Sequence, residues 1–258
     1  MKKLAFTLAE VLLVVAIIGV VSVLTVNNAL KSTKTAEKIT QLKKTYDILN
    51  AAVMAGMNDV GTPYKWGYAG SGTTDNDLNR STIEKVLVPH LKLQEDCGTA
   101  SGCWTSTIKP SVYESSTTID SSTKFYKGIL ANGASFAMKF GSLEGNDYTY
   151  GDNDFGEMFD NSTAVIFVDV NGPDKGAGKL GDDVFAFLFD SLKVPAGLEP
   201  MGNYATLSEK SSGDDYAVCP YHGEYCTAWA FYKGNQDYFV CPNTLSWTDP
   251  EKSHCSLE

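Results

Sequence analysis

The stretch that decides the fold lies at the start of the chain. It reads Lys2-Lys3-Leu4-Ala5-Phe6-Thr7-Leu8-Ala9-Glu10 and continues as an apolar run to Val26, in which Glu10 is the only charged residue. A helix over residues 6–26 would be about 31 Å long, which matches the hydrocarbon core of a bilayer. The two lysines ahead of the run predict a cytoplasmic N-terminus, with the rest of the chain on the other side of the membrane.

Two simpler interpretations of this stretch explain less of it. An ordinary secretory signal has a shorter apolar core that ends in a small-x-small cleavage site, whereas Asn27-Asn28-Ala29 follows here. A plain membrane anchor gives no reason for Glu10, because a carboxylate at the centre of a bilayer costs about 2.5–3.5 kcal/mol. The pattern therefore indicates a spanning segment whose carboxylate has a partner.

The same residues resemble the signal of type IV prepilins and type II secretion pseudopilins: a short basic leader, then Phe6-Thr7-Leu8-Ala9-Glu10 and an apolar helix. The resemblance covers residues 2–26. It implies cleavage between Ala5 and Phe6 by a prepilin peptidase and N-methylation of the new Phe6 amine. Ala5 departs from the family pattern, in which Gly usually precedes the cut. Glu10 would pair with the Phe6 amine of a neighbouring subunit and so set the register of assembly.

The resemblance also implies a function and partners. We expect an exported structural subunit of a type II secretion pseudopilus or a type IV pilus, held in the inner membrane before assembly. Its partners would be copies of itself, related pilins, the prepilin peptidase and the inner-membrane assembly platform. A minor pilin-like adhesin or tip subunit is the alternative, and a membrane-tethered enzyme is a third. The sequence does not separate pseudopilus from pilus, or major from minor subunit.

An amphipathic helix is predicted to continue the apolar one over residues 27–57. Its apolar positions recur every three or four residues: Ile39, Leu42, Tyr46, Leu49, Val53 and Met57. With residues 1–5 as the leader and 6–26 as the membrane and filament-core segment, this predicts one long N-terminal helix. Its second half would pack on a head.

The head is predicted to be α+β and pilin-like. Residues 58–126 are expected to be mainly loop, with one short helix that starts at the capping box Ser81-Thr82-Ile83-Glu84. Residues 127–190 should form an antiparallel sheet. Its strands are expected at 128–131 and 135–140, around an Asn132-Gly133 turn, and at 164–169 and 184–189.

Six cysteines follow residue 96, an even number in a segment expected to be exported, which favours disulfides. Cys97 and Cys103 are expected to pair across their short loop. The other four would give residues 191–258 a disulfide-rich character. Cys219–Cys226 and Cys241–Cys255 are the expected pairs, and other pairings stay open because spacing does not fix connectivity.

Charge and motifs exclude several functions. The net charge is −10, and residues 1–57 carry seven cations and three anions, so the remainder carries −14. Such an acidic head would repel phosphates, and we expect no nucleic-acid partner. Hydrolase, metalloprotease and phosphate-loop motifs are missing from the sequence, so we expect no enzyme activity.

One acidic turn is a candidate calcium site. Asp169, Asn171 and Asp174 follow a predicted strand in Asp169-Val170-Asn171-Gly172-Pro173-Asp174, and oxygen-rich side chains on such a turn suit Ca²⁺. The alternative is an Asx-type turn that joins two strands. A second acidic turn, Asp152-Asn153-Asp154-Phe155-Gly156-Glu157, is a weaker candidate.

Overall fold

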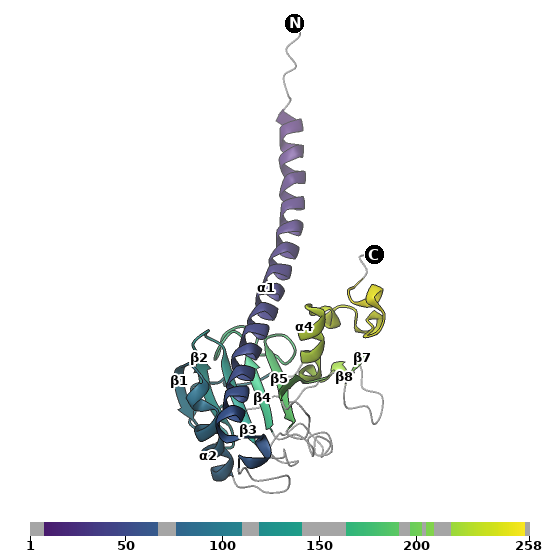
Figure 1. Cartoon of the computed structure of the whole chain (residues 1–258). Coiled ribbons are helices and arrows are strands. Elements are labelled where there is room, and N and C mark those ends of the chain that lie inside the picture. Colours follow the sequence, from purple (N-terminus) through teal and green to yellow (C-terminus); the bar gives the residue numbers. More distant parts are fainter. Residues whose placement is uncertain are drawn as a thin grey trace. The chain divides into compact units, whose positions relative to one another are not determined.

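The computed structural model describes residues 8–66, 76–109, 119–140, 164–190, 197–202, 205–208 and 218–255, with residues 21, 23–31, 64, 76, 79 and 190 described by their backbone only. Two compact units, residues 1–37 and residues 38–258, are considered separately. The first helix, α1 (Leu8–Val60), contains the boundary between them. The second unit is an α+β domain, as expected (Figure 1).

A six-stranded antiparallel sheet forms the centre of the second unit. Its strands are β1 (Leu93–Gly98), β2 (Tyr126–Leu130), β3 (Ser135–Phe140), β4 (Ala164–Asp169), β5 (Val184–Asp190) and β6 (Gly197–Pro200). They lie side by side in sequence order. The Asn132-Gly133 turn joins β2 to β3 as predicted, with Gly133 at a φ of 86°, a value that suits glycine. Strands β2, β3 and β4 are buried along their whole length.

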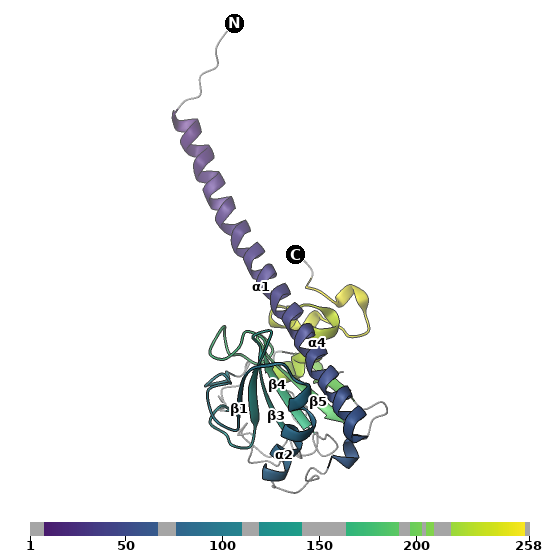
Figure 2. The same ribbon diagram turned by 60° about the vertical axis from the view of Figure 1, so that its left-hand side comes forward.

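The predicted stripe of α1 faces the core of this unit. Ile39, Leu42, Leu49 and Val53 are buried, and Tyr46 and Met57 pack against the core from partly buried positions. Figure 2 shows this part of α1 and the helix α2 (Asn76–Val86) on the same side of the sheet. Helix α1 also contacts the edge strand β6, where the Tyr46 hydroxyl donates a hydrogen bond to the Leu198 carbonyl at 3.1 Å.

The region predicted as mainly loop, residues 58–126, holds more structure than expected. It contains strand β1 and the short 3-10 helices η1 (Pro63–Lys65) and η2 (Val88–His90). The predicted capping box is wrong, because α2 begins at Asn76 and Ser81 lies inside it, where its hydroxyl donates to the Leu78 carbonyl. Apolar packing of Ile83 and Val86 on the core stabilises α2, and the local Ser-x-x-Glu pattern does not mark the start of this helix.

A buried lysine fixes the loop that precedes β2. The Lys127 side chain is fully buried, and its ammonium donates to the carbonyls of Thr99, Asp120 and Ser122 at 2.7–3.0 Å. Burial lowers the Lys127 pKa. Three carbonyl acceptors satisfy all three ammonium donors, so this lysine joins β2 to the segments on either side of residues 110–118.

The C-terminal part consists of short elements. They are β7 (Thr206–Ser208) and β8 (Val218–Pro220), which pair in parallel, α4 (Thr227–Lys233), and the 3-10 helices η3 (Gly223–Cys226), η4 (Asp237–Phe239), η5 (Pro242–Thr244) and η6 (Pro250–Lys252). Disulfides are confirmed. The three pairs are Cys97–Cys103, Cys219–Cys226 and Cys241–Cys255, which leave no free cysteine.

Candidate functional site

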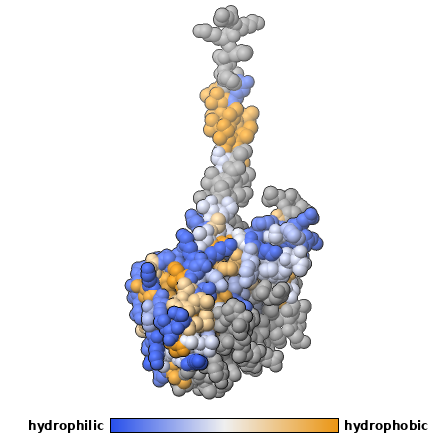
Figure 3. Space-filling view, in the orientation of Figure 1, coloured by the Kyte–Doolittle hydropathy of each residue, from blue (hydrophilic) through white to orange (hydrophobic). Residues whose placement is uncertain are grey.

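The first candidate site is the apolar part of α1. Every residue from 8 to 20 is exposed in the single chain. Nine large apolar side chains are between 48% and 77% exposed: Leu8, Val11, Leu12, Leu13, Val14, Val15, Ile17, Ile18 and Val20. Five consecutive helical positions, 11–15, point to all sides of a helix, so the surface is apolar all round, and Figure 3 colours this part of α1 orange. A helix that is apolar on every side is normally surrounded by lipid or protein.

The predicted processing and assembly residues fall at the edge of this segment. Ala5 and Phe6 lie outside the described residues. Glu10 is exposed in the first turn of α1 and is the only acidic residue there. Within the parts of the chain that the structure describes, no helix has the length and apolar character needed to cross a membrane. The predicted spanning segment, residues 6–26, includes positions 6, 7, 21 and 23–26, whose side chains are not among those described.

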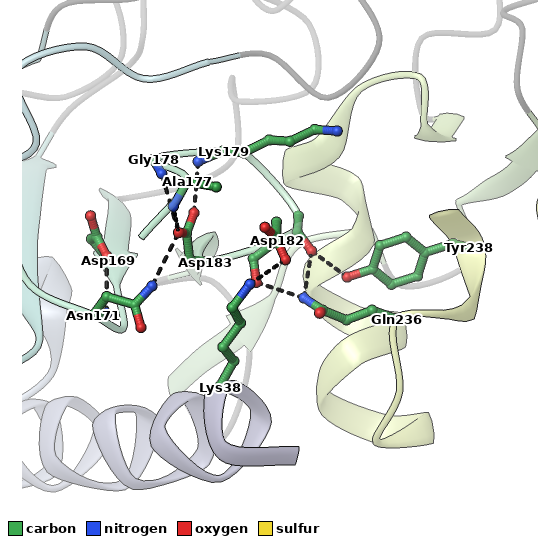
Figure 4. A network of polar contacts seen from close by, with 11 residues as sticks. Lys38, Asp169, Asn171, Ala177, Gly178, Lys179, Asp182, Asp183, Gln236 and Tyr238 are labelled. Carbon is green, nitrogen blue, oxygen red and sulfur yellow. Dashed lines mark hydrogen bonds and ion pairs between the residues drawn. The ribbon is translucent and has the colours of Figure 1, made fainter. Parts of the chain in front are cut away.

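The second candidate site is the loop between β4 and β5, residues 170–183, where the calcium site was expected. Its centre is the fully buried carboxylate of Asp183. The carboxylate accepts hydrogen bonds from the backbone N–H groups of residues 177, 178 and 179 at 2.5–3.1 Å and from the Asn171 side-chain amide at 3.1 Å (Figure 4). Four donors compensate the buried charge and fix the fold of the loop.

Side chains from distant parts of the second unit hold the end of this loop. The Lys38 ammonium of α1 pairs with the Asp182 carboxylate at 2.5 Å, with both side chains mostly buried. Gln236 donates from its amide to the carbonyls of Gly181 and Asp182 at 3.0 and 2.6 Å, and the Tyr238 hydroxyl donates to the Gly181 carbonyl. The loop therefore connects α1 with the C-terminal part of the chain, as Figure 4 shows.

Each of the three predicted calcium ligands has hydrogen-bond partners within the protein. Asp169 is fully buried and accepts hydrogen bonds from the Thr105 hydroxyl and from the Asn171 backbone N–H, the latter at 3.0 Å. Burial raises the Asp169 pKa to about 7. Asp174 accepts instead from the backbone N–H and the hydroxyl of Ser106, at 2.9 and 2.8 Å, which lowers its pKa.

The Asn171 amide is directed at Asp183, so the turn is built from internal hydrogen bonds. Among the described residues, one group of three acidic or cysteine ligand atoms lies within 4.8 Å: Glu95, Cys97 and Cys103. The two cysteines form a disulfide and offer no thiolate to a metal. The second acidic turn, Asp152 to Glu157, lies outside the described residues.

The sequence predicted the acidic turn after β4 but not the distant side chains that hold it. Lys38 and Asp182 are 144 positions apart, and no local pattern links them. The basic character of residues 31–44 beside an acidic head was a weak signal for such a pair. Comparisons of the chain with protein-family models, with curated proteins and with solved structures found no match.

Proposed function

We propose that the chain is a structural subunit of a filament of the type IV pilin kind, in either a type II secretion pseudopilus or a type IV pilus. The observation that carries the proposal is the apolar surface of residues 8–20, which surrounds the helix and includes one carboxylate, Glu10. Burying a single such Val, Leu or Ile side chain is worth about 1.5–3 kcal/mol, so nine of them strongly favour an environment other than water.

Two environments suit this surface at different times. Before assembly, residues 6–26 would span the inner membrane, with the head exported. After assembly, the same residues would pack against those of neighbouring subunits. Because Glu10 would then be buried, it requires a cation from a neighbour, and the amine of a processed Phe6 provides one. The disulfides of the head agree with an exported, oxidising location.

The β4–β5 loop has a structural role in this proposal. The ion pair of Lys38 with Asp182, and the bonds of Gln236 and Tyr238, join α1 to the C-terminal part of the head. A force applied to α1 within the second unit would thus reach the sheet through packing and through this network. Such a connection suits a subunit that is held in a filament by its helix.

Processing provides the test. In cells with an active prepilin peptidase, intact-mass measurement of the membrane-bound protein should show the loss of residues 1–5 and the addition of one methyl group. A mature protein that still begins at Met1, while other prepilins are cleaved in the same cells, would contradict the proposal. Neighbouring genes for a secretion platform or for pilus retraction would then distinguish the two kinds of filament.

A further inference from the structure

One buried carboxylate is left without compensation. Glu224 belongs to η3, a segment of four buried residues inside the loop that Cys219 and Cys226 close. Its side chain is 2% exposed. Neither carboxylate oxygen has a hydrogen-bond partner among the residues that the structure describes. Since nearly all buried polar groups in native proteins are paired, this group must either be neutral or destabilise its surroundings.

The segment around Glu224 is seated directly on the sheet. The Thr227 hydroxyl accepts a hydrogen bond from the Ala186 backbone N–H of β5 at 2.9 Å and donates to the Glu224 carbonyl at 2.8 Å. On the side of β6, Gly202 has a φ of 89°, and a Cβ there would lie 1.8 Å from the Tyr225 carbonyl oxygen. This contact between two backbones leaves the segment no freedom to shift while it remains seated.

No cation faces the Glu224 carboxylate from the described side chains packed around it. Strands β5, β6 and β8 contain no cation, and the charged residue of β6 is the acid Glu199. Lys179 of the β4–β5 loop, whose Gly181 packs on Gly223, has its ammonium 4.6 Å from the Phe239 ring centre, and Lys233 of α4 donates to the Trp247 carbonyl at 3.0 Å. His222 lies two residues before Glu224, and burial lowers its pKa, which favours its neutral form. Tyr225 has a raised pKa, partly because of Glu224 itself.

Burial raises the Glu224 pKa from 4.5 to about 7. We propose that Glu224 is a pH-sensitive element: it is neutral while η3 is seated on β5 and β6, and it ionises when residues 218–233 open to water. This element would act whether or not the chain assembles into a filament.

The sign of the effect follows from proton linkage. Opening returns the carboxyl group to its ordinary pKa, so between pH 4.5 and about 7 each opening event releases one proton from Glu224. His222 opens with the same segment, and its return to the ordinary pKa of 6.5 takes up a proton in part of this range. Glu224 alone therefore makes the equilibrium constant for opening rise about tenfold per pH unit, and His222 reduces this slope where both groups titrate. The segment is therefore most firmly seated in acid and opens most often above neutral pH.

Hydrogen exchange read by mass spectrometry on the full chain in detergent micelles tests this directly. In a His222→Gln chain, which lacks the opposing titration of His222, the exchange of residues 218–233, corrected for the intrinsic rate at each pH, should increase about tenfold per unit from pH 5 to about 7, under conditions where closing is faster than exchange. A peptide from α2 serves as the internal reference and should show no such change.

Substitutions distinguish the effect of Glu224 on the pH dependence of opening from the effects of other titratable groups. In the same His222→Gln chain, Glu224→Gln keeps the shape and removes the proton, so the opening of residues 218–233 should become independent of pH. If the Glu224→Gln variant folds poorly, Glu224→Met serves as a second variant with the same expected result. Asp169→Asn is the matched control, because Asp169 is also a buried acid with a raised pKa but lies in β4. It should keep the pH dependence. A flat profile in the His222→Gln chain, or an unchanged slope in both Glu224 variants, would overturn the proposal.

Discussion

Two parts of helix α1 differ in whether their apolar side chains are buried. Residues 38–57 of α1 carry an apolar stripe, and that stripe is buried against the core of the second unit. Residues 8–20 are apolar on every side, and all of them are exposed in the single chain. The first part has its partners within the chain, whereas the second part must find them elsewhere. Apolar side chains thus serve folding at one end of α1, and in the proposed filament they would serve association at the other.

The largest effect that this comparison predicts is on assembly. Glu10→Ala should still insert and be processed, since the apolar segment becomes more apolar, yet it should form no filaments when it is the only subunit. Breaking a buried ion pair by removing one partner costs about 3–5 kcal/mol at every interface. Electron microscopy of cells that express the variant alone measures the result.

The control for this experiment is Glu37→Ala, which removes an exposed carboxylate from the same helix beyond the apolar part. It should assemble normally, and the unfolding temperature of the head should be unchanged in both variants. Normal filaments from Glu10→Ala would show that the carboxylate does not set the register.

A matched pair of Leu→Ala substitutions in α1 is expected to give the next largest effect. Leu42 is fully buried and Leu12 is 61% exposed, and both lie in α1. Leu42→Ala should lower the free energy of unfolding of the head by about 2–5 kcal/mol, through lost burial and the cavity it leaves. Leu12→Ala should leave this free energy unchanged within error and should weaken assembly instead. Thermal unfolding followed by near-ultraviolet circular dichroism on the full chain compares them, and equal effects would remove the distinction between the two parts.

The sequence predicted those features whose cause is local. The three-and-four spacing from Ile39 to Met57 set the buried face of α1, and Asn132-Gly133 set the hairpin of β2 and β3. Strand β1 was missed because Leu93-Gln94-Glu95-Asp96-Cys97-Gly98 has no apolar alternation and its pairing with β2 is interrupted by two register shifts. An edge strand with charges and irregularities lacks the usual strand pattern, although these features protect it from unwanted pairing.

The candidate site was less predictable, because tertiary contacts decide its chemistry. The acidic turn at Asp169 was visible in the sequence, but part of its hydrogen bonds come from Thr105 and Ser106, more than 60 positions away. The burial of Lys127 and Glu224 was equally hidden, since each lies in a segment whose neighbours in sequence do not reveal what covers it. For the start of α1, by contrast, the sequence was sufficient. The apolar run alone predicts that residues 8–20 need a partner outside the chain.

The smallest expected effect concerns calcium, and it tests whether the second unit is complete without a ligand. Ca²⁺ takes six to eight oxygen ligands, while Asp169 and Asp174 here accept from separate protein donors. The Lys38 ammonium already supplies a cation at Asp182. We therefore expect the melting temperature of the full chain to be the same in excess Ca²⁺ and in chelator.

A bound ion would give a clear contrary result. At a hundredfold excess over its dissociation constant, Ca²⁺ would add about 2.7 kcal/mol, which raises the melting temperature of a domain of this size by several degrees. Asp174→Asn then locates the site, because it removes an exposed carboxylate from the β4–β5 loop without opening a cavity. If the increase disappears in this variant, the ion binds at the loop, whose hydrogen bonds must rearrange to receive it. If it persists, the ion binds elsewhere in the chain, and the loop is held by its own hydrogen bonds and by the ion pair of Lys38 with Asp182.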